Sequence, residues 1–216
     1  MPLLVACGPK TGTPLQPPSG AFTVSDYFAA SGDMADGNGM SAPGMVQTNE
    51  YTTSMCGDKA RISGARGHCF VFDYVPGPNL FAGVYFQYPA NNWGAKTGLP
   101  VHPDKFTKVS FQYAVSDTSA NGTTVKFEAG GIGYPMHTDA DIAAGITNSD
   151  QFDASDTPQT PTSDWQPFSL TIPPGEITSV TNIIGAFAWY VSYPMGADFT
   201  TLTPTTVYID DLVYEE

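Results

Sequence analysis

The strongest constraint on the fold is the division of the chain into strand-length segments by turn residues. The 216 residues include 22 Gly and 19 Pro, and the apolar stretches between them are short and rich in aromatic and β-branched side chains. For example, the turn sequence Pro-Gly-Pro-Asn separates residues 69–75 (CFVFDYV) from residues 80–88 (LFAGVYFQY). This pattern is typical of many short strands joined by tight turns, so we expect an all-β protein.

Alternation of apolar and polar residues predicts further strands. In residues 107–115, Val109, Phe111 and Tyr113 fall on one face and polar residues fall on the other. The dipeptide Asn121-Gly122 then predicts a hairpin between this strand and the next, at 124–129. Together with strands expected at 21–24, 165–172, 183–193 and 206–214, the total is about eight. Long loops are expected at 28–45 and 130–163, the second with one helical turn near 139–144.

The length of the chain is compatible with one domain. All-β sandwiches commonly reach about 200–250 residues as a single unit, so we expect one domain at residues 21–216. Residues 1–20 precede it as a separate segment. Their second part, residues 8–20, holds four prolines and lacks apolar periodicity, which predicts an extended tether.

The run Leu4-Val5-Ala6-Cys7 resembles the lipobox of bacterial lipoproteins, in which small residues precede a cysteine that becomes lipidated. It departs from that pattern because only six residues precede Cys7, without the basic and apolar regions of a signal peptide. Either the native start lies further upstream and Cys7 carries a lipid anchor, or the segment is only an apolar N-terminal stretch. The first interpretation predicts an exported lipoprotein at the outer membrane, at the cell surface or outside the cell.

The charge balance limits the partners. The chain has 8 Lys and Arg against 21 Asp and Glu, a formal net charge of −13. Such a surface repels phosphate backbones and anionic lipids, which argues against nucleic-acid binding. No segment reaches the roughly 18 apolar residues of a helical membrane span, so a lipid anchor is the one membrane attachment that we expect. The acidic surface suits neutral ligands or cations, and we expect a monomer.

Two further cysteines form a close pair in the sequence. Cys56 and Cys69 flank a polar stretch, and a disulfide between them would close a short loop, which stabilises a fold by about 3 kcal/mol in the chain-entropy description. In an exported protein we expect this pair to be oxidised. Two buried thiols are the alternative.

Three segments of the C-terminal part follow a recognisable order. They are WQPFSL at residues 165–170, IIGAF at 183–187 and VYIDDL at 207–212. This order resembles the C-terminal half of galactose-binding-like jelly rolls, which include many non-catalytic carbohydrate-binding modules. The resemblance covers residues 80–214 and is weak over 21–79. It implies an antiparallel two-sheet β-sandwich of the jelly-roll type that binds a polysaccharide or other glycan.

The resemblance also implies a structural calcium ion. In such domains the first Asp of the closing motif is a usual ligand, which corresponds to Asp210, and a loop after the first strand supplies partners, for which Asp33 and Asp36 are the candidates. Ca²⁺ prefers six to eight oxygen ligands, and carboxylates in a Gly-rich loop can provide them. The alternative is that these aspartates cap turns, as Asp beside Gly commonly does.

Sugar binding needs flat apolar rings beside amide or carboxylate groups. The segment around Trp93 offers this mixture, because two asparagines precede the ring and a glycine follows it. We therefore predict ligand contacts from Trp93, Tyr88, Asn92 and Tyr190. Period-2 alternation places Tyr190 on the face opposite Phe187 and Trp189, which we expect in the core. The alternative for Trp93 is a ring that closes one end of the sandwich.

No catalytic constellation is recognisable in the sequence, and whether the protein is an enzyme is left open. The histidines His68, His102 and His137 lack metal-ligand spacing, and a pair of glycosidase carboxylates has no motif to mark it among 21 acidic residues. The alternatives to a carbohydrate-binding module are a surface adhesion lipoprotein with a protein partner and a polysaccharide-active hydrolase or lyase. A sugar binder should carry a strip of aromatic rings, an adhesion module a large apolar patch, and an enzyme a deep cleft.

Overall fold

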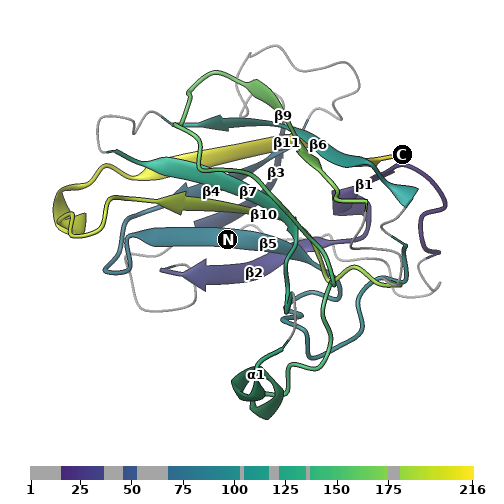
Figure 1. The fold of residues 1–216 in the computed structure, drawn as a ribbon. Helices are drawn as coiled ribbons and strands as arrows, with labels where there is room; N and C mark the ends of the chain where they lie inside the picture. Colours follow the sequence, from purple (N-terminus) through teal and green to yellow (C-terminus); the bar gives the residue numbers. More distant parts are fainter. Residues whose placement is uncertain are drawn as a thin grey trace, which may run out of the picture.

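The protein is a sandwich of two antiparallel β-sheets in a computed structural model, which describes residues 16–36, 46–52, 68–102, 105–116, 122–134, 137–174 and 181–216 (Figure 1). The six-stranded sheet has the order β3 (Val46–Thr52), β4 (His68–Tyr74), β11 (Thr205–Glu215), β6 (Lys108–Val115) and β9 (Gln166–Thr171), with β1 (Phe22–Thr23) paired to β11. The five-stranded sheet has the order β2 (Ala29–Ala35), β5 (Phe81–Gln87), β10 (Gly185–Ser192), β7 (Thr124–Gly130) and β8 (Asp153–Ser155). The predicted two-sheet all-β sandwich is confirmed.

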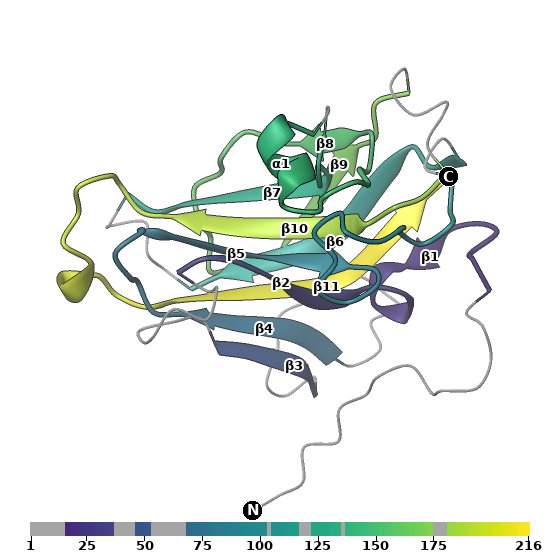
Figure 2. The same cartoon turned by 90° about the horizontal axis from the view of Figure 1, so that it is seen from below.

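The connectivity is that of a jelly roll. Within the two sheets, the orders β4-β11-β6-β9 and β5-β10-β7-β8 face each other, and the chain changes sheet at nearly every step. This is the arrangement of two interlocked Greek keys. The strands β2 and β3 extend the two sheets at their edges, where Figure 2 shows β3 beside β4 at the border of the molecule.

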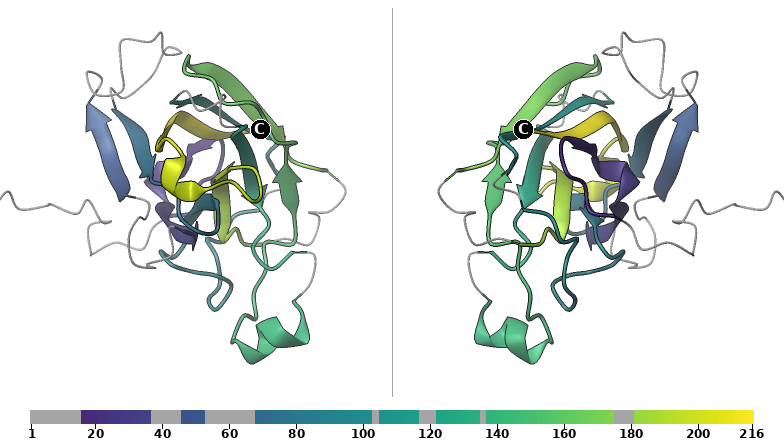
Figure 3. Two further views of the ribbon diagram at one scale, coloured as in Figure 1. Left: turned by 90° about the vertical axis from the view of Figure 1, so that its left-hand side faces the viewer. Right: turned by 90° about the vertical axis from the view of Figure 1, so that its right-hand side faces the viewer.

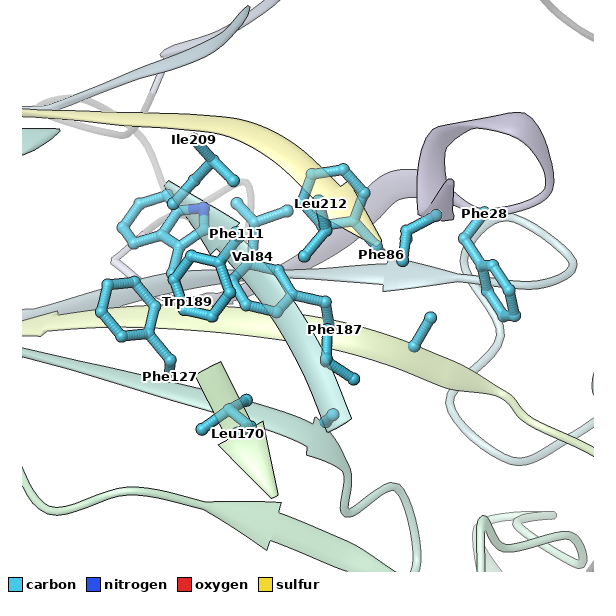
Figure 4. Close-up of a cluster of buried hydrophobic side chains, with 14 of the residues drawn as sticks. Phe28, Val84, Phe86, Phe111, Phe127, Leu170, Phe187, Trp189, Ile209 and Leu212 are labelled. Atoms are coloured by element: carbon cyan, nitrogen blue, oxygen red, sulfur yellow. The ribbon is translucent and has the colours of Figure 1, made fainter. Parts of the chain in front are cut away.

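The core lies between the sheets and consists largely of aromatic rings (Figure 4). On β10, Phe187, Trp189 and Val191 point inward as the alternation predicts, and all three are fully buried. Phe127 on β7 stacks on Phe187 with ring centroids 6.0 Å apart. Truncating a buried Trp or Phe to Ala typically costs about 3–5 kcal/mol, so these rings make a large contribution to holding the sheets together.

The predicted hairpin at Asn121-Gly122 is wrong. Strand β6 belongs to the six-stranded sheet, whereas β7 pairs with β10 and β8 in the five-stranded sheet. The connection between β6 and β7 therefore crosses from one sheet to the other. An Asn-Gly dipeptide favours a tight reversal, but β6 pairs with β11 and β9 whereas β7 pairs with β10 and β8, and this nonlocal pairing decides the sheet of each strand.

The predicted loop at 28–45 is wrong for its first part, because residues Ala29–Ala35 form β2. The strand consists mostly of small residues, so it carries no alternating signal, and its β structure comes from pairing with β5. Space at Gly32 is limited: a Cβ atom there would lie 2.7 Å from the Gln87 amide and 2.8 Å from Tyr85 Cβ. The predicted loop at 130–163 contains the short strand β8, which the sequence did not predict. The helical turn predicted near 139–144 is confirmed as α1 (Asp139–Ala143), which projects from the two sheets (Figure 3).

Two sequence predictions involve residues outside the described part. Cys7 lies in the undescribed N-terminal segment, and Cys56 lies between β3 and β4, so lipidation and the Cys56–Cys69 disulfide stay predictions. Cys69 itself is buried on β4. Among the described residues, the structure contains no helix with the length and apolar character needed to cross a membrane.

Candidate functional site

The outer face of the five-stranded sheet carries a compact group of polar and aromatic side chains. Alternation along the strands turns Tyr85 on β5, Glu128 on β7 and Tyr190 on β10 away from the core. Ala188 lies opposite both Tyr85 and Glu128 in register, and Gly83 lies opposite Tyr190. These two small residues leave room for the larger side chains. A Cβ atom at Gly83 would lie 3.1 Å from the Tyr190 ring.

Four rings follow one another across this face, and we call Phe81, Tyr190, Tyr85 and Trp93 the aromatic row. Phe81 and Tyr190 are nearly parallel, with centroids 5.8 Å apart and planes at 17°. Tyr190 and Tyr85 are 6.2 Å apart, and Tyr85 and Trp93 are 5.6 Å apart, both in edge-to-face geometry. Trp93 is the most accessible ring at 37% exposure, whereas Tyr85 is 5% exposed. The row therefore presents rings to solvent on both sides of a buried tyrosine.

A carboxylate lies beside the centre of the row. The Tyr85 hydroxyl donates to Glu128 Oε1, and the Tyr190 hydroxyl lies 2.7 Å from Glu128 Oε2 and 2.9 Å from the Tyr85 oxygen. Burial is the main reason that the pKa of each tyrosine is raised above its ordinary value, and the neighbouring Glu128 raises both further. Both phenols thus remain protonated and able to donate hydrogen bonds at any physiological pH.

One basic residue joins this group. Lys126 Nζ lies 3.8 Å from Glu128 Oε2 and 5.9 Å from the centroid of the Tyr190 ring, so it combines an ion pair with a cation–π contact. The Lys126 side chain is about one-third exposed, and that of Glu128 is 12% exposed. The face therefore offers a hydrogen-bond acceptor and several donors beside flat apolar surfaces. This combination can bind a ligand, and it contains no recognisable nucleophile with its base.

The loop that carries Trp93 is held by hydrogen bonds on both sides of the ring. The Asn92 side chain donates to the carbonyl oxygens of Tyr88 and Lys96 and accepts from the backbone N–H groups of Gly94 and Lys96. The Gly94 carbonyl in turn accepts from the backbone N–H groups of Thr147 and Asn148 and from the Asn148 amide. This network holds the backbone on both sides of Trp93 in place.

The structure brings together only part of the predicted ligand set. Trp93 and Tyr190 lie in one aromatic row, connected through Tyr85. Asn92 is 2% exposed, and its amide is fully engaged in the loop, so it holds Trp93 in place and does not face a ligand. The Tyr88 ring packs against the edge of the core, 6.2 Å from Phe28, and lies outside the row.

Sequence reasoning missed Tyr85, Glu128, Lys126 and Phe81. Alternation held part of the signal, because Tyr85 stands between the core residues Val84 and Phe86, and Glu128 follows Phe127. Alternation therefore places both side chains on the outer face of their strands. Whether they come into contact depends on the strand order β5-β10-β7, which the local sequence does not reveal.

The predicted calcium ligands do not form one group. Among the described residues, no three His, Cys, Asp or Glu side chains are placed to hold a metal ion together. Asp36 accepts hydrogen bonds from the Tyr74 hydroxyl and from the backbone N–H groups of Gly77 and Asn79. Burial opposes its charge, but these bonds lower its pKa overall. Asp33, whose pKa is raised by burial, lies on β2, whereas Asp210 lies on β11 in the other sheet.

Comparisons with known proteins give distant structural similarities only. No protein-family model matches the chain, and no curated protein matches its sequence. A mutant of CBM29-2, from a study of ligand recognition by family 29 carbohydrate-binding modules, is 7% identical with a TM-score of 0.32, over 68% of this chain and 70% of that chain. The arabinose-bound α-L-arabinofuranosidase MgGH51 is 13% identical with a TM-score of 0.38, over 79% of this chain but only 23% of that chain. Similarities at this level give no residue correspondence, so the outer face must be interpreted from its own geometry.

Proposed function

We propose that the protein binds a neutral polysaccharide on the outer face of the five-stranded sheet, without catalysis. The observation that carries this proposal is the aromatic row, which ends at the exposed Trp93 and has the Glu128 carboxylate beside its centre. Sugar rings present C–H faces that stack on such side chains, and their hydroxyl groups bind carboxylate, ammonium and phenol groups. Trp93 and the Phe81–Tyr190 pair serve as stacking surfaces in this proposal.

Electrostatics favour a neutral ligand over an anionic one. Lys126 is already paired with Glu128, and the net charge of −13 repels an approaching carboxylate or sulfate group. We further propose that the domain is exported and attached to the cell surface through a lipid on Cys7, as a monomer. The lipobox-like run before the proline-rich segment supports this part.

The test is binding by the Trp93→Ala variant to a panel of immobilised neutral polysaccharides, with Cys7→Ser in all proteins to exclude lipidation. An aromatic hot-spot residue typically contributes about 2 kcal/mol or more, so we expect affinity to fall by about thirtyfold or more. Because the ring is partly exposed, the variant should stay folded. Trp165→Ala is the matched control, since Trp165 packs against Tyr208 on the other sheet, and it should keep full affinity.

Two outcomes would contradict the proposal. Full affinity in a folded Trp93→Ala variant would place the ligand elsewhere. If no glycan in the panel bound the unmodified domain, the protein-adhesion alternative would replace carbohydrate binding.

A further inference from the structure

A buried carboxylate binds backbone segments that pack against the aromatic row, and the ligand contacts proposed above explain neither its burial nor its partners. Asp150 is fully buried. Its Oδ2 accepts from the backbone N–H of Ile132 at 3.1 Å and from that of Gly185 at 3.2 Å, and its Oδ1 accepts from the N–H of Ile184. One side chain thus joins the segment after β7 to the beginning of β10.

The two segments that Asp150 joins support Tyr85. Ile132 and Ile184 form a buried apolar cluster with Tyr85 and Ala188. Gly185 lies against the Tyr85 ring, because a Cβ atom there would come within 2.9 Å of it. Movement of either segment would therefore shift the ring at the centre of the row.

The same stretch of chain also reaches the other end of the row. Two residues before Asp150, the backbone and side-chain amides of Asn148 both donate to the Gly94 carbonyl, at 2.8 and 3.1 Å. Gly94 follows Trp93 directly. Residues 147–150 therefore connect the loop that carries Trp93 with the segments that support Tyr85.

We propose that Asp150 is a positioning residue of the aromatic row and that its protonation controls the affinity of this face for its ligand. The proposal rests on the carbohydrate-binding function proposed above. In the charged form, both carboxylate oxygens accept backbone hydrogen bonds. Each oxygen accepts from two backbone N–H groups, since Gly185 also donates to Oδ1 at 3.3 Å. A proton on either oxygen would therefore compete with one of these donors, and the neutral acid would hold the two segments less tightly.

The titration falls near neutral pH. Burial raises the pKa of Asp150 to about 7, although its three backbone donors oppose this shift, and the nearby charge of Glu128 adds to it. Tyr214 of β11 also faces Asp150, and burial keeps it protonated. His137 is a further titratable group on this side of the molecule, because its ring and the Asn148 carbonyl both lie close to Gly133. Above the titration of Asp150 we expect tighter ligand binding than below it.

The first experiment measures binding from about pH 5.5 to 8.5 to a soluble neutral β-glucan, a galactomannan and a xylan. For wild type we expect affinity to rise with pH. Asp150→Asn should bind about tenfold more weakly at high pH, the size expected when a hydrogen bond to a charged group is lost, and its affinity should not vary with pH. His137→Gln is the control and should keep the wild-type profile. A flat profile in wild type, or an unchanged profile in Asp150→Asn, would overturn the proposal.

The second experiment needs no ligand and so separates this proposal from the carbohydrate function. Carboxyl-carbon and tyrosine-ring NMR signals of the wild-type protein are followed over the same pH range. We expect the Tyr85 ring signals and the Trp93 indole signal to shift with the midpoint of the Asp150 carboxyl group. If these signals stay fixed while Asp150 titrates, Asp150 does not position the row. If they move but no polysaccharide binds, the positioning role stands and the carbohydrate function fails. The measurement also applies if Asp150→Asn does not fold.

Discussion

Tyr85 is the residue on which the aromatic row depends, since its ring contacts Tyr190 on one side and Trp93 on the other. Its hydroxyl donates to a carboxylate that is itself mostly buried. Hydrogen bonds of this kind contribute more than those between neutral groups, and removing one leaves a charged acceptor with a weaker set of partners.

We therefore expect Tyr85→Phe to lower the free energy of unfolding by about 2 kcal/mol, within the range of roughly 1.5–3 kcal/mol for a hydrogen bond to a charged group. Urea denaturation would measure this change. Glu128→Gln provides the comparison, because in that background the same Tyr85→Phe change should cost about half as much or less. An equal cost in both backgrounds would mean that the Tyr85–Glu128 hydrogen bond contributes nothing measurable.

Among the strands, β2 gives the clearest case of a close approach that the sequence does not reveal. It pairs with β5 along the edge of the five-stranded sheet, and Gly32 lies against Gln87 and Tyr85. We expect Gly32→Ala to cost about 1–3 kcal/mol through overpacking and to displace Tyr85, measured by thermal unfolding and by loss of polysaccharide affinity. Gly20→Ala is the control, because a Cβ there meets only the Glu216 side chain at 3.3 Å. Equal stability of the two variants would contradict the expectation.

The strands with a strong alternating or apolar pattern, from β4 to β7 and from β9 to β11, were predictable from the sequence. The strands β2, β3 and β8 were not, because their sequences lack this pattern and their β structure comes from pairing with a stronger neighbour. The same distinction applies to the site. Trp93 and Tyr190 were identified by residue type and alternation, whereas Tyr85 and Glu128 join them through the nonlocal order of the strands.

For the whole molecule, the buried Asp150 predicts a specific dependence of stability on pH. Its pKa is about 7 in the folded protein, against 3.8 for an ordinary aspartate in water, so the folded state binds the proton more tightly than the unfolded chain. The contribution of this group is therefore fully present below about pH 4, is lost as pH rises through 7, and stays lost above it. We expect the stability difference between wild type and Asp150→Asn to become less favourable to wild type from about pH 4 to 7, and to change little above that, as urea denaturation would show. A constant difference would contradict this assignment.

A bound calcium ion would also affect the stability of the whole domain, because an ion that binds only the folded state raises its free energy of unfolding. The described residues form no site for such an ion, but residues 37–45 after β2 lie outside them, so the calcium ion stays a prediction from the sequence. It implies that chelation lowers the melting temperature, since an ion at a hundredfold excess over its Kd adds about 2.7 kcal/mol. Asp210→Ala should remove the difference, with Asp73→Ala on the neighbouring strand β4 as control. Identical melting curves with and without chelator would exclude a stabilising ion.

The hydrogen bonds of Asn92 have a consequence for the kinetics of ligand exchange. The Asn92 amide holds the Trp93 loop in its conformation without a ligand. Glu128 likewise holds Tyr85 and Tyr190 through hydrogen bonds to their hydroxyl groups. Such a preorganised binding surface loses little conformational entropy when a ligand binds, and it needs no rearrangement before the ligand makes contact. We expect different glycans to associate at similar rates and to differ in how long they remain bound, with residence time set by the number of rings each sugar chain covers.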